Sequence, residues 1–187
     1  MTLKSRTLTE SSLKQTIDLE ELLGRRPTAS ESSAFEIELL EKIIGRTQDG
    51  KDVNGKSFIN YTEEYAETKG VSRSDVDLTL FGDMLLSMET SSSKGKIDLT
   101  IEGEEAAKAY GHVSGFKGHP TIKNGPKRDF FGVSDREAKQ IANNIKEAST
   151  QSIADLFTAS RVLDSEESRN EILNNIGLFT GDGGLFG

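Results

Sequence analysis

Residues Gly95–Ile101 read Gly-Lys-Ile-Asp-Leu-Thr-Ile, in which polar and apolar side chains alternate. A period of two puts the apolar residues on one face and the polar ones on the other, which is the pattern of a half-buried strand. The stretch Asp75–Phe81 alternates likewise, with Val76, Leu78 and Leu80 on one face. Two to four strands of this kind are expected in the chain, and they predict a small antiparallel sheet.

Two helices are predicted before these strands. Residues Thr9–Leu23 carry leucine and isoleucine at helical spacing, and Gly24 follows them as a stop signal. A second helix is expected from Thr28, which has the capping-box spacing with Glu31. Its apolar stripe ends at Gly45, where we expect the helix to end.

A long helix is predicted after the strands. Ser134 and Glu137 repeat the capping-box spacing, and apolar residues recur at helical intervals as far as Phe157 or Leu163. Two short helices are predicted at Thr62–Lys69 and Asp83–Met88. Because helices and strands do not alternate in a regular βαβ order, the predicted fold class is α+β.

The predicted architecture is a small antiparallel sheet packed with a long helix, plus N-terminal helices and an extended C-terminal arm. Residues 1–27 are expected to form an N-terminal helical extension, and residues 28–163 the α+β core domain. Residues 164–187 are expected to hold a last helix, opened by Asp164 and stopped by Gly177, and a glycine-rich arm.

The C-terminal arm has an unusual composition. Four of its last seven residues are glycine, so it gains little from forming regular structure alone. It nevertheless contains the pairs Leu178-Phe179 and Leu185-Phe186. We interpret the arm as a segment that docks apolar anchors onto a neighbour. The alternative is an unstructured end that contains the two pairs by chance.

Composition excludes several classes of site. The chain has 187 residues, no cysteine and two histidines, so a disulfide framework, a thiolate metal centre, a cysteine nucleophile and a multi-imidazole metal site are excluded. His112 and His119 lie in a glycine-rich stretch without the spacing of a metal pair, and we interpret them as loop residues. No catalytic, cofactor-binding or metal-binding residue is therefore assigned.

The charge distribution leaves two interpretations open. Residues 111–146 are basic and lie between acidic segments, in a chain of net charge −8. Such asymmetry favours head-to-tail contacts between copies, or an intramolecular pairing of the same charges. The basic run that ends at Lys127 and Arg128 could contact DNA, but the overall acidity opposes specific binding. Neither a membrane span nor a signal peptide is indicated.

Five stretches, taken in order, carry a resemblance to a known family. They are Gly50–Phe58, Tyr61–Lys69, Val76–Ser87, Ala106–His112 and Lys127–Asp135. Together they resemble the phage virion morphogenesis family, the tail-completion or head–tail joining proteins of Mu-like tailed phages, over roughly residues 35–148. One departure is that Pro126 lies upstream of the position where the family usually has a proline before its aromatic motif.

The resemblance implies a structural virion protein of a tailed bacteriophage and no enzymatic activity. The expected role is tail completion or head–tail joining, as a homo-oligomeric ring of six or twelve subunits at the neck or tail end, after assembly in the host cytoplasm. Expected partners are a portal or head-completion protein and a tail terminator or tail tube protein, with DNA passing through the lumen unbound. The predicted interface residues are Arg128, Phe130, Phe131, Leu178, Phe179, Leu185 and Phe186.

Alternatives stay open at this level. Phe130 and Phe131 precede a capped helix, so their rings could instead wedge under its first turn. The protein could also be a tail terminator or another minor tail protein. From other classes come a small cytoplasmic adaptor that binds through its arm, and a hydrolase that depends on His112.

Overall fold

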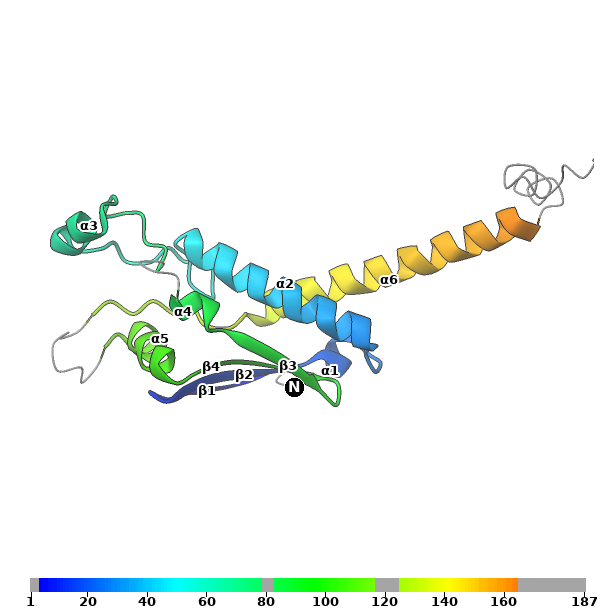
Figure 1. Cartoon of the computed structure of the whole chain (residues 1–187), viewed down its shortest axis with the longest axis horizontal. Coiled ribbons are helices and arrows are strands. Elements are labelled where there is room, and N and C mark those ends of the chain that lie inside the picture. Colours follow the sequence, from blue (N-terminus) through cyan, green and yellow to red (C-terminus); the bar gives the residue numbers. More distant parts are fainter. Residues whose placement is uncertain (1–3, 79–82, 117–124, 165–187) are drawn as a thin grey trace, which may run out of the picture. The chain divides into compact units, whose positions relative to one another are not determined.

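The computed structural model describes residues 4–78, 83–116 and 125–164, and these form a mixed α+β fold (Figure 1). The strands are β1 (Lys4–Leu8), β2 (Ser12–Asp18), β3 (Glu89–Ser93) and β4 (Lys96–Glu102). The helices are α1 (Leu19–Leu23), α2 (Ala29–Gln48), α3 (Glu63–Lys69), α4 (Asp83–Leu86), α5 (Glu104–Ser114) and α6 (Asp135–Asp164). The predicted class, with a small antiparallel sheet and a long helix, is confirmed.

The sheet has the strand order β1-β2-β4-β3, and every neighbouring pair is antiparallel. The predicted strand at residues 95–101 is β4, with Ile97, Leu99 and Ile101 fully buried. On β2 the inward positions are Leu13, Gln15 and Ile17, all 0–1% exposed. The two central strands therefore build one apolar face, interrupted by a single glutamine.

The helix predicted over Thr9–Leu23 is wrong. Residues 4–18 form the β1–β2 hairpin, and only Leu19–Leu23 is helical. Leu13 and Ile17 are four residues apart, a spacing that suits one face of a helix and equally one face of a strand. Strand β2 lies between β1 and β4 and pairs with both, so tertiary pairing decided between the two patterns. Residues 4–18 thus belong to the sheet and do not form a helical extension.

The capped helices are confirmed. In α2, Thr28 Oγ1 accepts a hydrogen bond from the Glu31 N–H at 3.2 Å, and Glu31 Oε2 accepts one from the Thr28 N–H at 2.9 Å. The helix runs to Gln48, about one turn past the predicted end at Gly45. A glycine only lowers helix propensity and does not by itself end a helix. Gly45 keeps a helical conformation, and α2 continues through it. The short helix α3 is also confirmed, capped by Thr62.

A strand at Asp75–Phe81 was predicted, and residues 75–78 do not form one. Val76 and Leu78 are buried, as their apolar character requires, but Leu78 has φ of +57°, which is incompatible with an extended strand. Residues 79–81 lie outside the described residues. The edge strand β3 has the sequence Glu-Thr-Ser-Ser-Ser, which carries no apolar residue and gave no strand signal.

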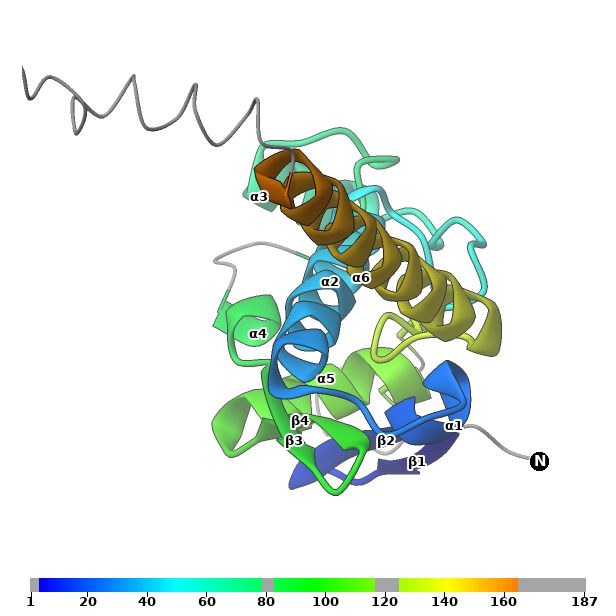
Figure 2. The ribbon, with the colours of Figure 1, turned by 90° about the vertical axis from the view of Figure 1, so that its right-hand side faces the viewer.

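Helices cover one face of the sheet. Figures 1 and 2 show α2 and α5 above the strands, and α5 contacts β2 and β4 while α2 contacts β3. The outer face of the sheet is polar, with the Lys14 ammonium 2.8 Å from a carboxylate oxygen of Asp98 and the Thr16 hydroxyl donating to the other. The apolar core therefore lies on the helical side.

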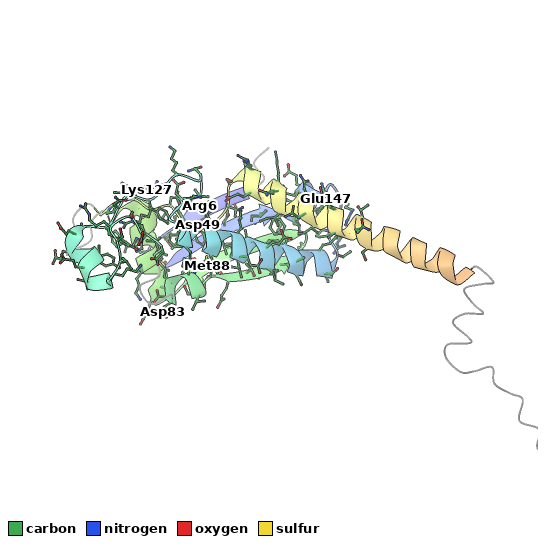
Figure 3. The ribbon with its side chains drawn as sticks, turned by 90° about the horizontal axis from the view of Figure 1, so that it is seen from above. Arg6, Asp49, Asp83, Met88, Lys127 and Glu147 are labelled. Carbon is green, nitrogen blue, oxygen red and sulfur yellow. The ribbon has the colours of Figure 1, made fainter. Side chains whose placement is uncertain are left out.

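The described residues divide into two compact units between Ile145 and Lys146. The first unit holds the sheet, helices α1–α5 and the first turns of α6, where Ala138, Ile141, Ala142 and Ile145 are buried. Along the part of α6 whose side chains are described, buried positions stop at Ile145, and no residue from 146 to 152 is buried. Glu147, labelled in Figure 3, is among the exposed ones.

Candidate functional site

The segment that precedes α6 is held by Arg46 of α2. Arg46 Nη1 lies 2.8 and 2.9 Å from the two carboxylate oxygens of Glu137, and its Nη2 donates to the carbonyl oxygens of Phe130 at 2.7 Å and Gly132 at 2.8 Å. Burial alone would raise the pKa of Glu137, but hydrogen bonds from Ser134 and the charge of Arg46 lower it. One arginine therefore satisfies both the capping carboxylate and the backbone that leads into the helix.

Gln15 of β2 holds the same segment from the sheet. Its Nε2 donates to the Val133 carbonyl at 3.0 Å, and its Oε1 accepts from the Val133 N–H at 2.8 Å. Gly132 has φ of +81°, and a Cβ at that position would lie 2.4 Å from Gln15 Oε1. Only glycine fits both the backbone conformation and the close approach of this side chain.

Phe130 and Phe131 are fully buried in this arrangement, at 0% exposed. They were predicted as interface residues, and the structure places both rings in the core, where they offer no area to a partner. The alternative interpretation, packing under the start of the long helix, is the one the burial fits. Leu178, Phe179, Leu185 and Phe186 lie outside the described residues, so their interface role stays a prediction.

Arg128, the third predicted interface residue of this motif, lies in a polar cluster around Tyr61. Its Nη2 donates to the Ile59 carbonyl at 3.0 Å, its backbone N–H donates to the His112 carbonyl at 2.8 Å, and its Cζ lies 5.1 Å from the centroid of the Tyr61 ring. The side chain is buried, and burial lowers the pKa of its guanidinium. Arg128 thus joins three segments that are distant in the sequence.

The hydroxyl of Tyr61 organises the other side of the cluster. It accepts hydrogen bonds from Lys69 Nζ and from the Leu78 N–H, each at 3.3 Å, and lies 3.4 Å from Asp77 Oδ1. Lys69 and Asp77 form an ion pair. The Tyr65 ring packs against that of Tyr61 with 4.8 Å between centroids, and Tyr65 is 39% exposed. The cluster is therefore buried beneath a partly exposed tyrosine.

His112 lies beside this cluster and is largely buried; it belongs to the last turn of α5, so its interpretation as a loop residue is wrong. Burial first, and the charge of Arg128 second, lower the pKa of His112 to about 4. Its ring meets the edge of Phe116 at 5.0 Å between centroids, and Nδ1 has no hydrogen-bond partner among the described residues. A neutral, buried imidazole without a hydroxyl or carboxylate bonded to it lacks the arrangement of a general base.

The segments that carry the family resemblance converge in the structure. The Val53 N–H donates to the Asp129 carbonyl at 2.8 Å, Tyr61 and Asp77 meet through Lys69, and Arg128 bonds to the backbone of His112. Asp129 also forms an ion pair with Arg6 of β1. Figure 3 labels Arg6 and Lys127, the exposed residue that precedes Arg128 in the sequence. Sequence order alone did not predict this meeting, nor the roles of Gln15 and Arg46, which belong to no motif.

Two other kinds of feature, a metal site and a membrane span, were sought in the described ranges. Within residues 4–78, 83–116 and 125–164, no three histidine or acidic side chains are grouped as a metal site requires. None of the helices in those ranges combines the length and apolarity needed to cross a membrane. His119 lies outside the described residues, as do Lys117 and Lys123, which belong to the basic run that ends at Lys127 and Arg128. No protein-family model matches the chain, and neither a curated protein nor a solved structure is significantly similar to it.

Proposed function

We propose that the chain is a non-enzymatic structural subunit of a tailed bacteriophage virion, a tail-completion or head–tail joining component that works as an oligomeric ring. The observation that carries the proposal is the length of α6. The helix continues from Lys146 to Asp164, and none of residues 146–152, the part of this continuation whose side chains are described, is buried. Nineteen residues of α-helix span about 28 Å, a length that offers a large surface for contact with a partner.

Physical chemistry favours a partner for such a helix. Isolated helices of this length are marginal in water, and most helical stability in proteins comes from tertiary packing. The apolar content of the chain is 34% without glycine and about 44% with its 18 glycines, slightly below the roughly 45–50% of an average domain counted with glycine. Apolar contact area supplied by neighbours fits this composition. A subunit of an assembly fits both features better than a protein that acts alone.

The convergence of the resembling segments adds support of a different kind. The resemblance rests on common residues that are dispersed along the sequence, and it would have no structural meaning if those residues also lay far apart in space. Here Tyr61, Lys69, Asp77 and Arg128 share one cluster. The pattern therefore belongs to one packed feature, which is what a family motif would describe.

The proposed partners are a second copy of the chain, a portal or head-completion protein on one side, and a tail terminator or tail tube protein on the other. Electron microscopy of purified virions with the protein labelled should place it at the neck or the tail end. Particles from a strain lacking the protein should appear as tailless heads beside free tails. Absence of the protein from mature particles would contradict the proposal.

The adaptor alternative predicts a different result with the same materials. An adaptor that binds only through its arm would be absent from virions and would lose all partner binding when residues 177–187 are removed. A neck subunit without those residues should keep its fold and lose tail joining or particle stability. The hydrolase alternative is disfavoured because His112 is buried and neutral, with no partner on its Nδ1 among the described residues.

A further inference from the structure

Arg128 differs from the other arginines that are buried or half-buried in this fold. Arg6 pairs with Asp129, and Arg46 pairs with Glu137. Arg128 is only 5% exposed, yet no carboxylate pairs with it among the described residues, and no acceptor there lies within hydrogen-bond distance of its Nε. A buried charge without a counter-charge is costly, so an added carboxylate at this point would be favourable.

The nearby cation Lys69 does not share this property, because Asp77 neutralises it. Tyr61 offers Arg128 its ring and Ile59 offers its carbonyl, and neither carries a negative charge. The cluster therefore holds one uncompensated positive charge among the residues that the structure describes.

Apolar surface lies beside that charge. Ile59, whose carbonyl accepts the Arg128 hydrogen bond, is 61% exposed, and Tyr65, whose ring packs on Tyr61, is 39% exposed. Tyrosine and arginine are the residue types in which binding energy concentrates at protein interfaces. We call Ile59, Tyr65 and Arg128 the Arg128 surface.

The chain contains a segment of matching chemistry. Leu178-Phe179-Thr-Gly-Asp182 has an apolar pair three residues before a carboxylate. Residues 165–187 carry four acidic side chains and one basic one, so the whole segment is attracted to a positive site. Leu178 lies fourteen positions after Asp164, the end of α6. An extended chain of that length reaches up to roughly 46–50 Å, which is enough to cross onto an adjacent subunit.

We propose that the segment Leu178–Asp182 of one copy docks on the Arg128 surface of a neighbouring copy. Phe179 packs against Tyr65 and Ile59, and the Asp182 carboxylate lies over the Arg128 side chain and supplies the counter-charge that this residue lacks. The inference rests on the proposed function only for its partner, a copy of the same chain in an assembly. The proposal gives the C-terminal arm a binding surface on a neighbouring copy, and it gives Arg128 a role in assembly.

The test uses the full chain with its own arm disabled by Phe179→Ser and Asp182→Asn, so that the arm does not compete. A fluorescent synthetic peptide of residues 177–187 is titrated into this protein and followed by anisotropy. The peptide should bind, and Tyr65→Ser or Ile59→Ser in the receptor should weaken binding at least about tenfold. Ile37→Ser is the matched control, since Ile37 is 58% exposed on α2, and it should leave the affinity unchanged.

A peptide carrying Asp182→Asn tests the charge. It should bind at least about fivefold more weakly, and added salt should weaken the wild-type peptide more than this variant. Circular dichroism of each receptor variant checks that its fold is intact. No binding up to about 1 mM peptide, or equal binding to the Tyr65→Ser and Ile37→Ser receptors, would overturn the proposal.

Sedimentation of the unmodified chain decides whether the contact is between copies. Association that rises with protein concentration and is lost in the arm-disabled chain supports docking on a neighbour. A chain that stays monomeric and ignores added peptide, while the arm-disabled chain binds it, has its arm on its own surface and overturns the proposal. Localisation in the virion is an independent measurement, so the proposed function can stand while this inference fails.

Discussion

Gln15 in the second strand and Val133 before the last helix are joined by two hydrogen bonds, one from the glutamine amide nitrogen at 3.0 Å and one to its oxygen at 2.8 Å. The two residues are 118 positions apart in the sequence. The glutamine takes the place of a neighbouring strand and satisfies both backbone groups of one buried residue. It is therefore a structural requirement of the sheet rather than a polar defect in it.

Replacing Gln15→Leu should destabilise the fold by about 2–4 kcal/mol, because it removes two hydrogen bonds to the buried backbone of Val133. Urea unfolding followed by circular dichroism measures the change. Gln140→Leu, at an exposed position of α6, should change the free energy of unfolding by less than about 0.5 kcal/mol. Equal effects of the two substitutions would show that the bonds to Val133 contribute nothing.

Gly132→Ala should cost about 3 kcal/mol. The alanine must adopt a positive φ, which costs roughly 1–2 kcal/mol, and its Cβ must displace the Gln15 side chain from its hydrogen bonds. Gly24→Ala is the control, since Gly24 also has a positive φ but nothing lies within 4 Å of the place that its new methyl group would take. A Gly24→Ala effect as large as that of Gly132→Ala would assign the whole cost to backbone conformation.

Arg46→Met should destabilise by about 3–5 kcal/mol, since it removes the ion-pair partner of the nearly buried Glu137 carboxylate and the donor to two backbone carbonyls. Lys14→Met removes an ion pair on the open face of the sheet and should cost about 0–1 kcal/mol. Thermal and urea unfolding of both variants give the comparison. A small effect for Arg46→Met would mean that the segment before α6 is held by packing alone.

His112 should make the protein less stable as the pH falls from about 6.5 towards 4. Its pKa in the folded chain, about 4, lies below the ordinary value of 6.5, so the unfolded chain binds the proton first. The loss approaches about 3 kcal/mol at the acid end of this window, at about 1.4 kcal/mol for each pH unit. Above pH 6.5 the histidine contributes no pH dependence.

The measurement compares urea unfolding of the wild-type chain and His112→Gln at several pH values between 7 and 4. The variant should lose less stability across the window than the wild type does. Parallel curves for the two proteins would contradict the assignment to His112.

The sequence predicted the starts of the capped helices α2 and α6 well because their caps are local. Thr28 with Glu31 and Ser134 with Glu137 each place a hydroxyl and a carboxylate three residues apart, and the structure forms both reciprocal bonds. Strand β4 was equally local, since alternation is visible within seven residues. Such signals need no knowledge of the rest of the chain.

The N-terminal strands could not be predicted in the same way. The inward face of β2 contains Gln15 between Leu13 and Ile17, and a glutamine at that position hides the alternation. The reason for its burial is Val133, which no local pattern could supply. Strand β3 has no apolar residue at all and takes its structure from its register with β4.

The same limit applies to the candidate site. Arg128 was noted from its motif, but its lack of a carboxylate partner among the described residues and its contact with Tyr61 appear only in three dimensions. Phe130 and Phe131 were misplaced on an interface because a sequence does not distinguish an aromatic pair that packs inward from one that packs outward. Arg46 belongs to no motif and was missed.

The bond between Gln15 and Val133 also has a consequence for synthesis of the chain. The ribosome makes β2 early, but the partner that satisfies its buried glutamine is made 118 residues later. Until the start of α6 has emerged, the nascent sheet carries an unsatisfied polar group in its centre and an incomplete core. The fold is thus completed only after Val133 has been made, and nascent chains that stall before Val133 should remain substrates for chaperones and proteases.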